Sequence, residues 1–331
     1  MTIRTKFIFI AAAAILAAAC NGGNTQNSEK KNEKVKAEQS MKALPFPDVQ
    51  VPSMISTQQE IIDYLAQNYW KGITEPSRDY LCDSLFVSGV DKSIVEQKFA
   101  DWTYILNNAP LEVSLKSVEK LYDAALACEK RNPASNVFDT FVMLTQKYFY
   151  DPNSPLRNEE YYLPFVSRYA TYEGLIDVER KKYEREARLC ALNRIGTKAA
   201  DFRFSDRYGK IRNLYDIDAE LTLLFFSNPG CGACMEIINV LKEDPTISSL
   251  ISAGVLKVLN IYIDEDIQAW RSYMPIYPDE WYNGFDPDLV IRNDEIYNIR
   301  AIPSLYLLDK EKNVLMKDVP ENVLFNYLVS L

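Results

Sequence analysis

Residues 221–243 read LTLLFFSNPGCGACMEIINVLKE, and they are the most informative part of the C-terminal half of the chain about its fold. A dense apolar run at its start, Leu221 to Phe226, is typical of a buried strand. Helix-like residues resume at Met235, directly after the octapeptide SNPGCGAC. Cys231 and Cys234 therefore fall at a strand-to-helix junction, where a spacing of three residues places both sulfur atoms on one face of the first helical turn.

The start of a helix is a favourable place for a reactive cysteine. Unpaired backbone N–H groups and the positive end of the helix dipole lie there, and both favour a thiolate over a thiol. Cys231 is thus the predicted nucleophile, and Cys234, one turn further in, is the predicted resolving thiol. The predicted active-site loop around them consists of Pro229, Gly230, Gly232 and Ala233. The motif predicts dithiol–disulfide exchange, which needs no cofactor beyond the two thiols.

Composition limits the function classes. The chain has 331 residues, of which 47% are hydrophobic and 25% charged, as in soluble globular proteins with room for two domains. Its net charge of −9 argues against nucleic acid as a partner. It contains no histidine, which excludes a Ser-His-Asp triad, a Cys-His protease dyad and any His-ligated metal.

Residues 1–20, MTIRTKFIFIAAAAILAAAC, read as a secretory signal with a basic start and an apolar stretch too short to span a bilayer. Small residues directly before Cys20 resemble a bacterial lipobox, which implies that Cys20 is lipidated. The alternative is a plain cleavable signal with an incidental cysteine. Residues 21–43 are polar and predict a flexible tether. We therefore expect the protein in the periplasm or cell envelope, lipid-anchored in a membrane, with the outer membrane favoured.

Residues 44–194 predict an all-helical domain of unknown function. Thr57 and Glu60 form a predicted capping box, and apolar and aromatic residues recur at helical spacing behind it. The loop DPNSPLRNEE, residues 151–160, interrupts the helices, which are expected to resume at 161–172 and 177–192.

From about residue 195 to residue 331 short β-rich runs alternate with helical ones, which predicts an α/β domain with a central sheet. The predicted strands are Asp201–Phe204, Ile211–Leu214, Leu221–Phe226, Val255–Ile263, Ser304–Leu308 and Val314–Lys317. The predicted helices are Ala233–Glu243, Ile267–Tyr273 and Glu321–Leu331. The fold class expected for the whole chain is an all-helical domain followed by an α/β domain with a mixed sheet.

Three segments carry a resemblance to a known family: GTKAADFRFSDRYGKIRNLYD from Gly196, FFSNPGCGAC, and Ile302-Pro303-Ser304. With them, residues 196–331 resemble the thioredoxin-like domains of envelope-tethered bacterial thiol–disulfide reductases. The resemblance implies that Pro303 follows a cis peptide bond and that Ile302 and Pro303 contact the substrate. Residues 270–298 look like an insertion that is usual in the tethered group.

The whole mature chain is similar to Bacteroidales lipoproteins that join an uncharacterised helical domain to a thioredoxin-like one, through the strings DPNSPLRNEE and AIPSLYLLDK. Two positions depart from many thioredoxins. Phe225 stands where a buried aspartate assists the second cysteine, and Asn260 falls where a lysine is frequent. Resolution of a mixed disulfide is then expected to be slower, or to use Glu236 or water.

The function implied is that of an envelope thiol–disulfide oxidoreductase that reduces or isomerises disulfides in exported proteins. Gly232 and Ala233 offer only backbone groups to a thiolate, which favours the reductive direction. The expected partners are disulfide-bearing envelope proteins and an upstream membrane thiol donor. The competing interpretation is a partner-binding lipoprotein whose thioredoxin-like domain is a scaffold with a static disulfide. A peroxide-reducing relative is disfavoured, because Leu224 and Asn228 replace the proline and the hydroxyl of its motif.

The remaining cysteines have simpler interpretations. A Cys-x-x-Cys pair can be half of a zinc site, but the chain has no second pair and no histidine, so no metal site is predicted. Buried packing is expected for Cys128 and Cys190, and a Cys82–Cys128 bridge stays open. Arg157 and Arg300 are expected to form structural salt bridges.

Overall fold

The computed structural model describes residues 43–75 and 84–331. The predicted signal peptide, Cys20 with its expected lipid, residues 21–42 of the tether, and Cys82 all lie outside the described residues.

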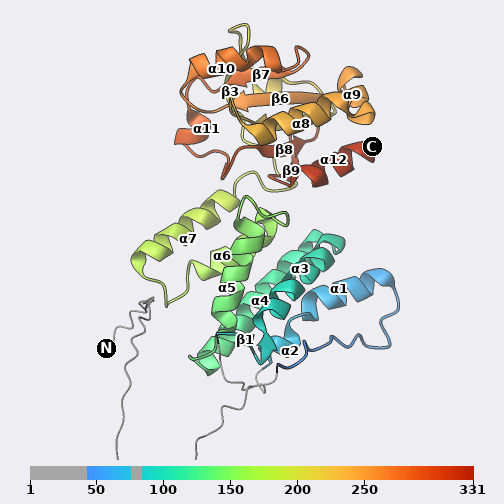
Figure 1. Cartoon of the computed structure of the whole chain (residues 1–331), viewed down its shortest axis with the longest axis vertical. Coiled ribbons are helices and arrows are strands. Elements are labelled where there is room, and N and C mark those ends of the chain that lie inside the picture. Colours follow the sequence, from blue (N-terminus) through green and yellow to red (C-terminus); the bar gives the residue numbers. More distant parts are fainter. Residues whose placement is uncertain (1–42, 76–83) are drawn as a thin grey trace, which may run out of the picture. The chain divides into compact units, whose positions relative to one another are not determined.

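The elements before residue 195 are mainly helical (Figure 1). The helices are α1 (Gln58–Asn68), α2 (Lys71–Thr74), α3 (Lys92–Asn108), α4 (Leu111–Arg131), α5 (Val137–Thr145), α6 (Glu159–Tyr169) and α7 (Asp177–Cys190), and a π-helical turn (Gln146–Tyr150) extends α5. The predicted capping box is confirmed, because Thr57 Oγ1 accepts a hydrogen bond from the Glu60 N–H and the Glu60 carboxylate accepts one from the Thr57 N–H, each at 3.2 Å. Aromatic side chains fill the core, chief among them Trp70, Phe99, Trp102, Phe138, Phe141, Phe149 and Phe165.

The prediction of helices alone before residue 195 is wrong at one place. A two-stranded antiparallel hairpin, β1 (Phe86–Val87) and β2 (Val90–Asp91), precedes α3. Ser88 and Gly89, the two residues between its strands, have φ of 49° and 77°. Two successive positive φ angles are what a two-residue hairpin turn between right-twisted strands requires, and β-branched valines flank the turn on both sides.

A mixed seven-stranded sheet organises the rest of the chain, in the order β4-β3-β7-β6-β5-β8-β9. Central strand β5 runs parallel to β6 and antiparallel to β8, and β6 runs parallel to β7. The strands are β3 (Arg203–Asp206), β4 (Ile211–Asn213), β5 (Leu221–Phe226), β6 (Leu256–Tyr262), β7 (Tyr282–Phe285), β8 (Ser304–Leu308) and β9 (Val314–Lys317). The predicted fold class, helices followed by an α/β part with a mixed sheet, is therefore confirmed.

Helices and loops cover the two faces of this sheet. Because successive side chains of a strand point to opposite faces, alternate residues of β5 belong to two different cores. Leu223 and Phe225 pack with residues of α8, α9 and α12, whereas Leu224 and Phe226 pack with residues of α11 and of the segment before β3. Figure 1 shows α8 lying across the strands. The helices are α8 (Gly232–Glu243), α9 (Pro245–Ser252), α10 (Ile267–Tyr273), α11 (Val290–Asn293) and α12 (Glu321–Val329), with short 3₁₀ turns at Leu214–Asp216 and Met274–Ile276.

The structure corrects two predicted details of the sheet. The first strand runs over Arg203–Asp206 rather than from Asp201 to Phe204, and the segment expected as an insertion supplies strand β7, between β6 and β3. Asn283 and Gly284 make β7 a weak strand by propensity. Gly284 is required by tertiary packing, because a Cβ there would lie 2.6 Å from Phe204 Cδ2 and 2.9 Å from the carbonyl oxygen of Ser205.

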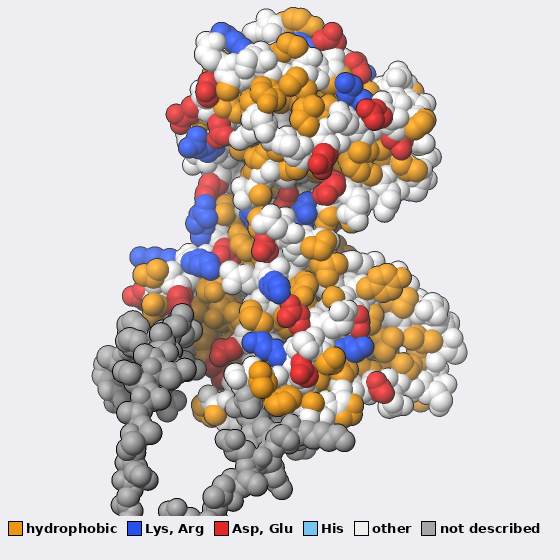
Figure 2. Space-filling model, in the orientation of Figure 1, with side chains coloured by type: hydrophobic (Ala, Val, Ile, Leu, Met, Phe, Trp, Pro, Cys, Tyr) orange, Lys and Arg blue, Asp and Glu red, His pale blue; other side chains and the backbone are white. Residues whose placement is uncertain are grey.

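Residues Ala43–Leu331 form one compact unit. Among its described helices none is both long enough and apolar enough to cross a membrane. Lys and Arg side chains are interspersed with Asp and Glu on the face shown in Figure 2, with no continuous basic patch there.

Candidate functional site

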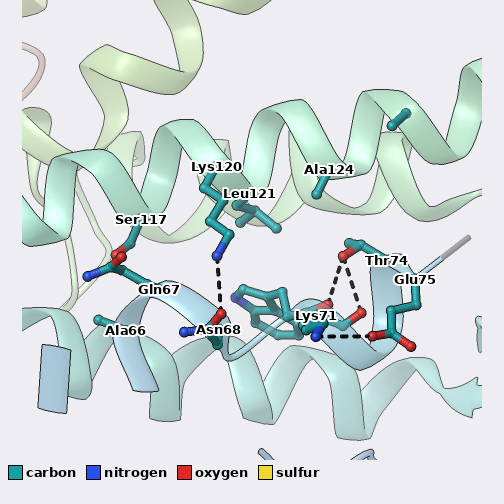
Figure 3. A pocket seen from close by; sticks show the side chains of 12 residues that line it. Ala66, Gln67, Asn68, Lys71, Thr74, Glu75, Ser117, Lys120, Leu121 and Ala124 are labelled. Atoms are coloured by element: carbon teal, nitrogen blue, oxygen red, sulfur yellow. Dashed lines mark hydrogen bonds and ion pairs between the residues drawn. The ribbon is translucent and has the colours of Figure 1, made fainter. Parts of the chain in front are cut away.

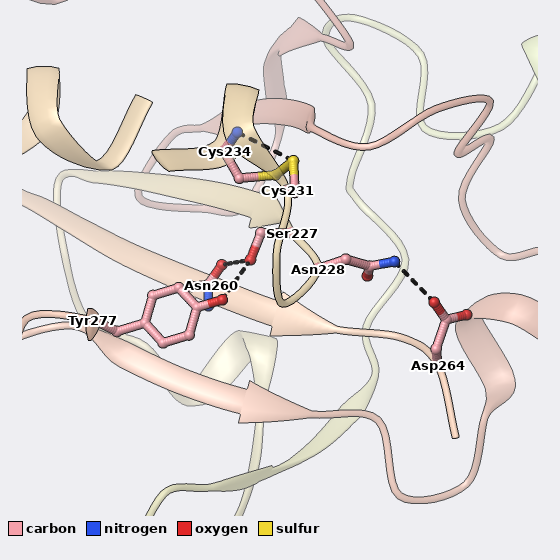
Figure 4. Close-up of a disulfide and its surroundings, with 7 residues drawn as sticks. All are labelled: Ser227, Asn228, Cys231, Cys234, Asn260, Asp264 and Tyr277. Carbon is pink, nitrogen blue, oxygen red and sulfur yellow. Dashed lines mark hydrogen bonds between the residues drawn. A yellow bond between two sulfur atoms is a disulfide. The ribbon is translucent and has the colours of Figure 1, made fainter. Parts of the chain in front are cut away.

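The cysteine motif begins with a tight turn after β5. The Cys231 N–H donates to the Asn228 carbonyl at 3.2 Å, and Gly230 has a φ of 80°. Proline at the second position and a positive φ at the third define a type II turn, which explains Pro229-Gly230. The Asn228 amide also donates to the Asp264 carboxylate at 2.9 Å, which ties the turn to the end of β6 (Figure 4).

Cys231 is the N-cap residue of α8. Its sulfur accepts a hydrogen bond from the Cys234 N–H at 3.1 Å, so it occupies the position that a serine or threonine oxygen fills in an ordinary cap. Cys231 and Cys234 form a disulfide, with their Cα atoms 5.2 Å apart. Cys231 is half-buried, whereas Cys234 is only 2% exposed. The pair therefore consists of one partly accessible cysteine and one covered cysteine at the positive end of a helix.

The loop before β8 lies beside this junction. Ser304, the first residue of β8, pairs with Phe226, the last residue of β5. The Ile302–Pro303 peptide bond is cis, as the resemblance implies. Ile302 and Pro303 are both half-buried, and Ile302 and Cys231 pack against the same core. The sheet register thus brings together the residues predicted to react and those predicted to contact substrate.

A buried polar group lies beneath the disulfide (Figure 4). The Ser227 hydroxyl donates to Asn260 Oδ1 at 2.5 Å and lies 3.3 Å from the Tyr277 hydroxyl. Asn260 pairs directly with Phe225 across the β5–β6 ladder, so the two departures from thioredoxins noted in the sequence are neighbours. An apolar side chain, Phe225, and an uncharged polar one, Asn260, stand here in place of an ionisable pair. Glu236, the other group considered for proton removal, is exposed on α8.

Buried charges hold the cis-proline loop in place. Arg300 forms ion pairs with Glu159 at 2.9 Å and with Asp318 at 2.6 Å, and Lys317 pairs with Glu159 at 2.8 Å. Asp318 also accepts a hydrogen bond from the Ser304 hydroxyl at 2.8 Å. All the side chains of these ion pairs are at most 7% exposed. The expected structural role of Arg300 is confirmed, and through Glu159 the first turn of α6 contacts the loop that carries Pro303.

The cysteines of the helical elements are in a different environment. Cys128 and Cys190 are free thiols and both are buried, as expected. Burial raises the pKa of Cys128, and it raises the pKa of Cys190 well above the ordinary thiol value. Such thiols are poor nucleophiles at neutral pH. Cys82, the other half of the bridge considered for Cys128, lies outside the described residues.

A separate cavity of about 490 Å³ lies between α1, α2 and α4 (Figure 3). Leu121 and Ala124 contribute apolar wall, and at its edge Lys120 donates to Asn68 at 3.1 Å. Trp70, which also lines it, is 4% exposed, and its indole N–H has no hydrogen-bond partner among the described residues. The described part of the chain contains no cluster of three or more His, Cys, Asp or Glu residues able to hold a metal ion.

Comparisons with known proteins agree with this fold. The solved structure of a thioredoxin-like protein from Bacteroides caccae is 35% identical, covers 88% of this chain and 99% of its own, and superposes with a TM-score of 0.74. The fold and the cysteine site therefore define a thioredoxin-like protein. Residues 19–193 match the family described as a domain of unknown function (DUF5106), and the chain belongs to this family.

Two further solved structures each match a part of the chain. The C-terminal domain of an uncharacterised protein from Bacteroides fragilis is 48% identical, covers 41% of this chain and 97% of its own, with a TM-score of 0.40. The thioredoxin domain of a thiol–disulfide oxidoreductase from Bacteroides vulgatus is 18% identical, covers 41% and 98%, and has a TM-score of 0.36. No curated protein matches the chain.

No local sequence pattern indicated the groups that surround the cysteines, because these groups come from distant segments of the chain. Tyr277 and the contact between Glu159 and Arg300 had no local signal, because each joins residues far apart in the chain. The sequence partly indicated a role for Asn260, because many thioredoxins have a lysine at the position that aligns with it. The type II turn had a full signal in the dipeptide Pro229-Gly230.

Proposed function

We propose that the protein is a thiol–disulfide oxidoreductase in which Cys231 and Cys234 exchange electrons with the disulfides of other proteins. One observation carries the proposal: a half-buried Cys231 caps α8 beside a cis Ile302–Pro303 bond, with Cys234 covered one turn further in. Buried structural disulfides do not need an accessible sulfur at a helix start.

The reaction starts from the reduced pair. The Cys231 thiolate attacks one sulfur of a substrate disulfide, the substrate S–S bond breaks, and the departing substrate thiolate takes a proton. The Cys234 thiolate then attacks the Cys231 sulfur, which closes the enzyme disulfide and releases the second substrate thiol. Two electrons pass to the substrate, and an upstream thiol donor must return two electrons to the Cys231–Cys234 disulfide before the next cycle.

Each step is supported by a separate contact. The Cys234 N–H, which donates to the Cys231 sulfur, stabilises negative charge on that sulfur when the pair is reduced. Ile302 is half-buried, and its backbone is the proposed edge along which an extended substrate segment pairs. Ser227, held by Asn260 and Tyr277, is the polar group beneath the pair that can take part in proton transfer from Cys234.

We further propose that the protein acts in the periplasm or cell envelope, held by lipid on Cys20, on exported proteins that carry disulfides. Disulfides persist in that compartment. The reductive direction is proposed because Gly232 and Ala233 add no charge or side-chain donor to the Cys231 thiolate. No cofactor besides the dithiol is required by this chemistry. A redox titration against glutathione is expected to give a potential nearer to about −270 mV than to about −120 mV, and a value above about −150 mV would contradict the reductive assignment.

Insulin reduction tests the proposal directly. Wild-type protein with a thiol donor should reduce insulin, and Cys231→Ser should not. Absence of turnover in the wild type would favour the competing function, a partner-binding scaffold. In cells, Cys234→Ala should accumulate mixed disulfides on Cys231, whose mass identifies the clients, and Cys231→Ser with Cys234→Ala should accumulate none.

A further inference from the structure

A groove of about 400 Å³ runs beside the cysteine site and is not part of the dithiol chemistry. One wall is formed by residues of α8 from Ala233 to Val240. Another wall is formed by the cis-proline loop together with α12. A third wall comes from loop 151–160, whose last two residues form the start of α6. The residues that line these three walls include Ala233, Ile237, Ile302, Pro303, Phe325 and Pro152. Apolar side chains thus form part of each wall, beside polar and charged ones.

Loop 151–160 is firmly fixed in this position. The Arg157 guanidinium donates to the carbonyl oxygens of Asp318 at 3.1 Å and Val319 at 2.9 Å, just before α12. Glu159, two residues further along, pairs with Arg300 at 2.9 Å, two residues before Ile302. Two independent anchors therefore hold the loop against the cis-proline segment. A wall anchored in this way can hold a fixed shape for a ligand.

The rim of the groove carries an excess of negative charge. Glu236 is exposed and has no ion-pair partner among the described residues, and Glu321, whose side chain is 57% exposed, lies 3.9 Å from Arg157. Arg157 is the only cation among the lining residues, its side chain is 12% exposed, and its N–H groups are directed to backbone carbonyls. The groove therefore pairs apolar walls with two accessible carboxylates.

We propose that this groove selects disulfide substrates whose cysteine is followed by an apolar residue and then a basic one, and that loop 151–160 of the DUF5106 region takes part in that selection. The proposal rests on the proposed function and adds its substrate class. The apolar side chain would bury surface between Ile302 and Phe325, while a lysine or arginine reaches Glu236 or Glu321. The helical region would in this way contribute to specificity without supplying any reacting atom.

The test compares two peptides, each a dimer joined by one disulfide and matched except at one position. In one peptide the cysteine is followed by Leu-Lys, and in the other by Leu-Glu. Single-turnover rates are measured with the full chain, prereduced, and the ratio of the two rates is the readout. Wild type is expected to reduce the Leu-Lys peptide about fivefold faster, and 0.5 M salt should lower the ratio because it screens exposed charges.

Variants of groove residues, each with a control outside the groove, test whether the groove causes the preference for the Leu-Lys peptide. Glu236→Gln combined with Glu321→Gln should bring the ratio close to one, whereas Glu243→Gln, an exposed carboxylate on α8 outside the groove, should leave it unchanged. Asn153→Lys adds a positive charge to the wall from loop 151–160 and should lower the ratio at least twofold. Asn107→Lys makes the same change on an exposed part of α3 and should not.

The outcomes separate the inference from the function on which it rests. A wild-type ratio near one, with both peptides and a small neutral disulfide reduced, would overturn the groove proposal and leave the oxidoreductase intact. An unchanged ratio in Asn153→Lys would overturn the role of loop 151–160. Failure of wild type to reduce any of the three disulfides would instead contradict the proposed function.

Discussion

Helices α1 and α8 begin with the same hydrogen bond. In α1 the Thr57 hydroxyl oxygen accepts from the Glu60 N–H at 3.2 Å, and in α8 the Cys231 sulfur accepts from the Cys234 N–H at 3.1 Å. Both acceptors satisfy a backbone donor that the helix leaves unpaired. The oxygen can only stabilise its helix, whereas the sulfur, once reduced, can also carry a negative charge there, as the proposed function requires of a nucleophile. The same local geometry can therefore stabilise a helix or position a reactive atom, according to the side chain that caps the helix.

Cys190 completes the comparison at the opposite end of a helix. It is the last residue of α7 and is fully buried, and burial raises its pKa well above the ordinary thiol value. The negative end of the helix dipole also disfavours a thiolate there. The same side chain is therefore expected to be reactive at the start of α8 and inert at the end of α7.

Replacing the sulfur at the start of α8 should have the largest effect. Cys231→Ser keeps a good N-cap residue but loses the nucleophile, so insulin turnover should fall by more than about 1,000-fold. Its free energy of unfolding, measured by urea titration with all thiols reduced, should stay within about 1 kcal/mol of wild type. The matched change Cys128→Ala should leave turnover within about twofold. Normal turnover in Cys231→Ser would break the comparison.

At a third helix start, that of α6, neutralising an acidic residue should lower the free energy of unfolding. Glu159 occupies the first turn, is 1% exposed and pairs with Arg300 and Lys317. Glu159→Gln leaves buried cations without their partner and should lower the free energy of unfolding by about 3–5 kcal/mol. Glu112→Gln removes the exposed pair with Lys116 and should cost less than about 1 kcal/mol, by urea or thermal denaturation. Equal costs for the two variants would show that the buried network does not stabilise the fold.

The contrast between Cys190 and an ordinary thiol predicts a dependence of stability on pH. Burial raises the pKa of Cys190 in the folded state. The contribution of the neutral Cys190 thiol to the free energy of unfolding is therefore fully present below the unfolded thiol pKa of about 8.5, and it is lost as the pH rises above that value. Between pH 8.5 and 9.5 the oxidised protein should lose up to about 1.4 kcal/mol of unfolding free energy per pH unit from this thiol. Urea titrations of Cys190→Ala should show a shallower slope, and parallel slopes would refute the assignment.

The smallest effect is expected at the cap that uses oxygen. Thr57→Ala removes the acceptor for the Glu60 N–H and should lower the free energy of unfolding by about 1 kcal/mol, within the range of about 0.5–2 kcal/mol for such caps. Insulin turnover should not change, because α1 supplies no residue to the cysteine site or its groove. Thr57→Ser is the control, since it keeps the hydroxyl and should retain stability. A loss of turnover in Thr57→Ala would mean that α1 contributes to the site.

Local physics made much of the fold predictable. The apolar run Leu221–Phe226, the Pro229-Gly230 turn and the spacing of Cys231 and Cys234 each act within a few residues, so the central strand, the turn and the helix start could be derived from residue types alone. The hairpin at Ser88-Gly89 and strand β7 escaped prediction, because short segments with glycine carry weak propensity and gain their stability from neighbouring strands.

The position of two cysteines at the start of a helix follows from consecutive residues alone, because hydrogen-bonding capacity and hydrophobic periodicity are local properties. The surroundings of those two cysteines depend on the folded chain. The contact of Glu159 with Arg300, the Ser227–Asn260–Tyr277 group and the groove beside Pro303 all join distant segments. Such contacts form only when the sheet register and the burial of both cores bring their partners within reach, and no local pattern encodes that distance.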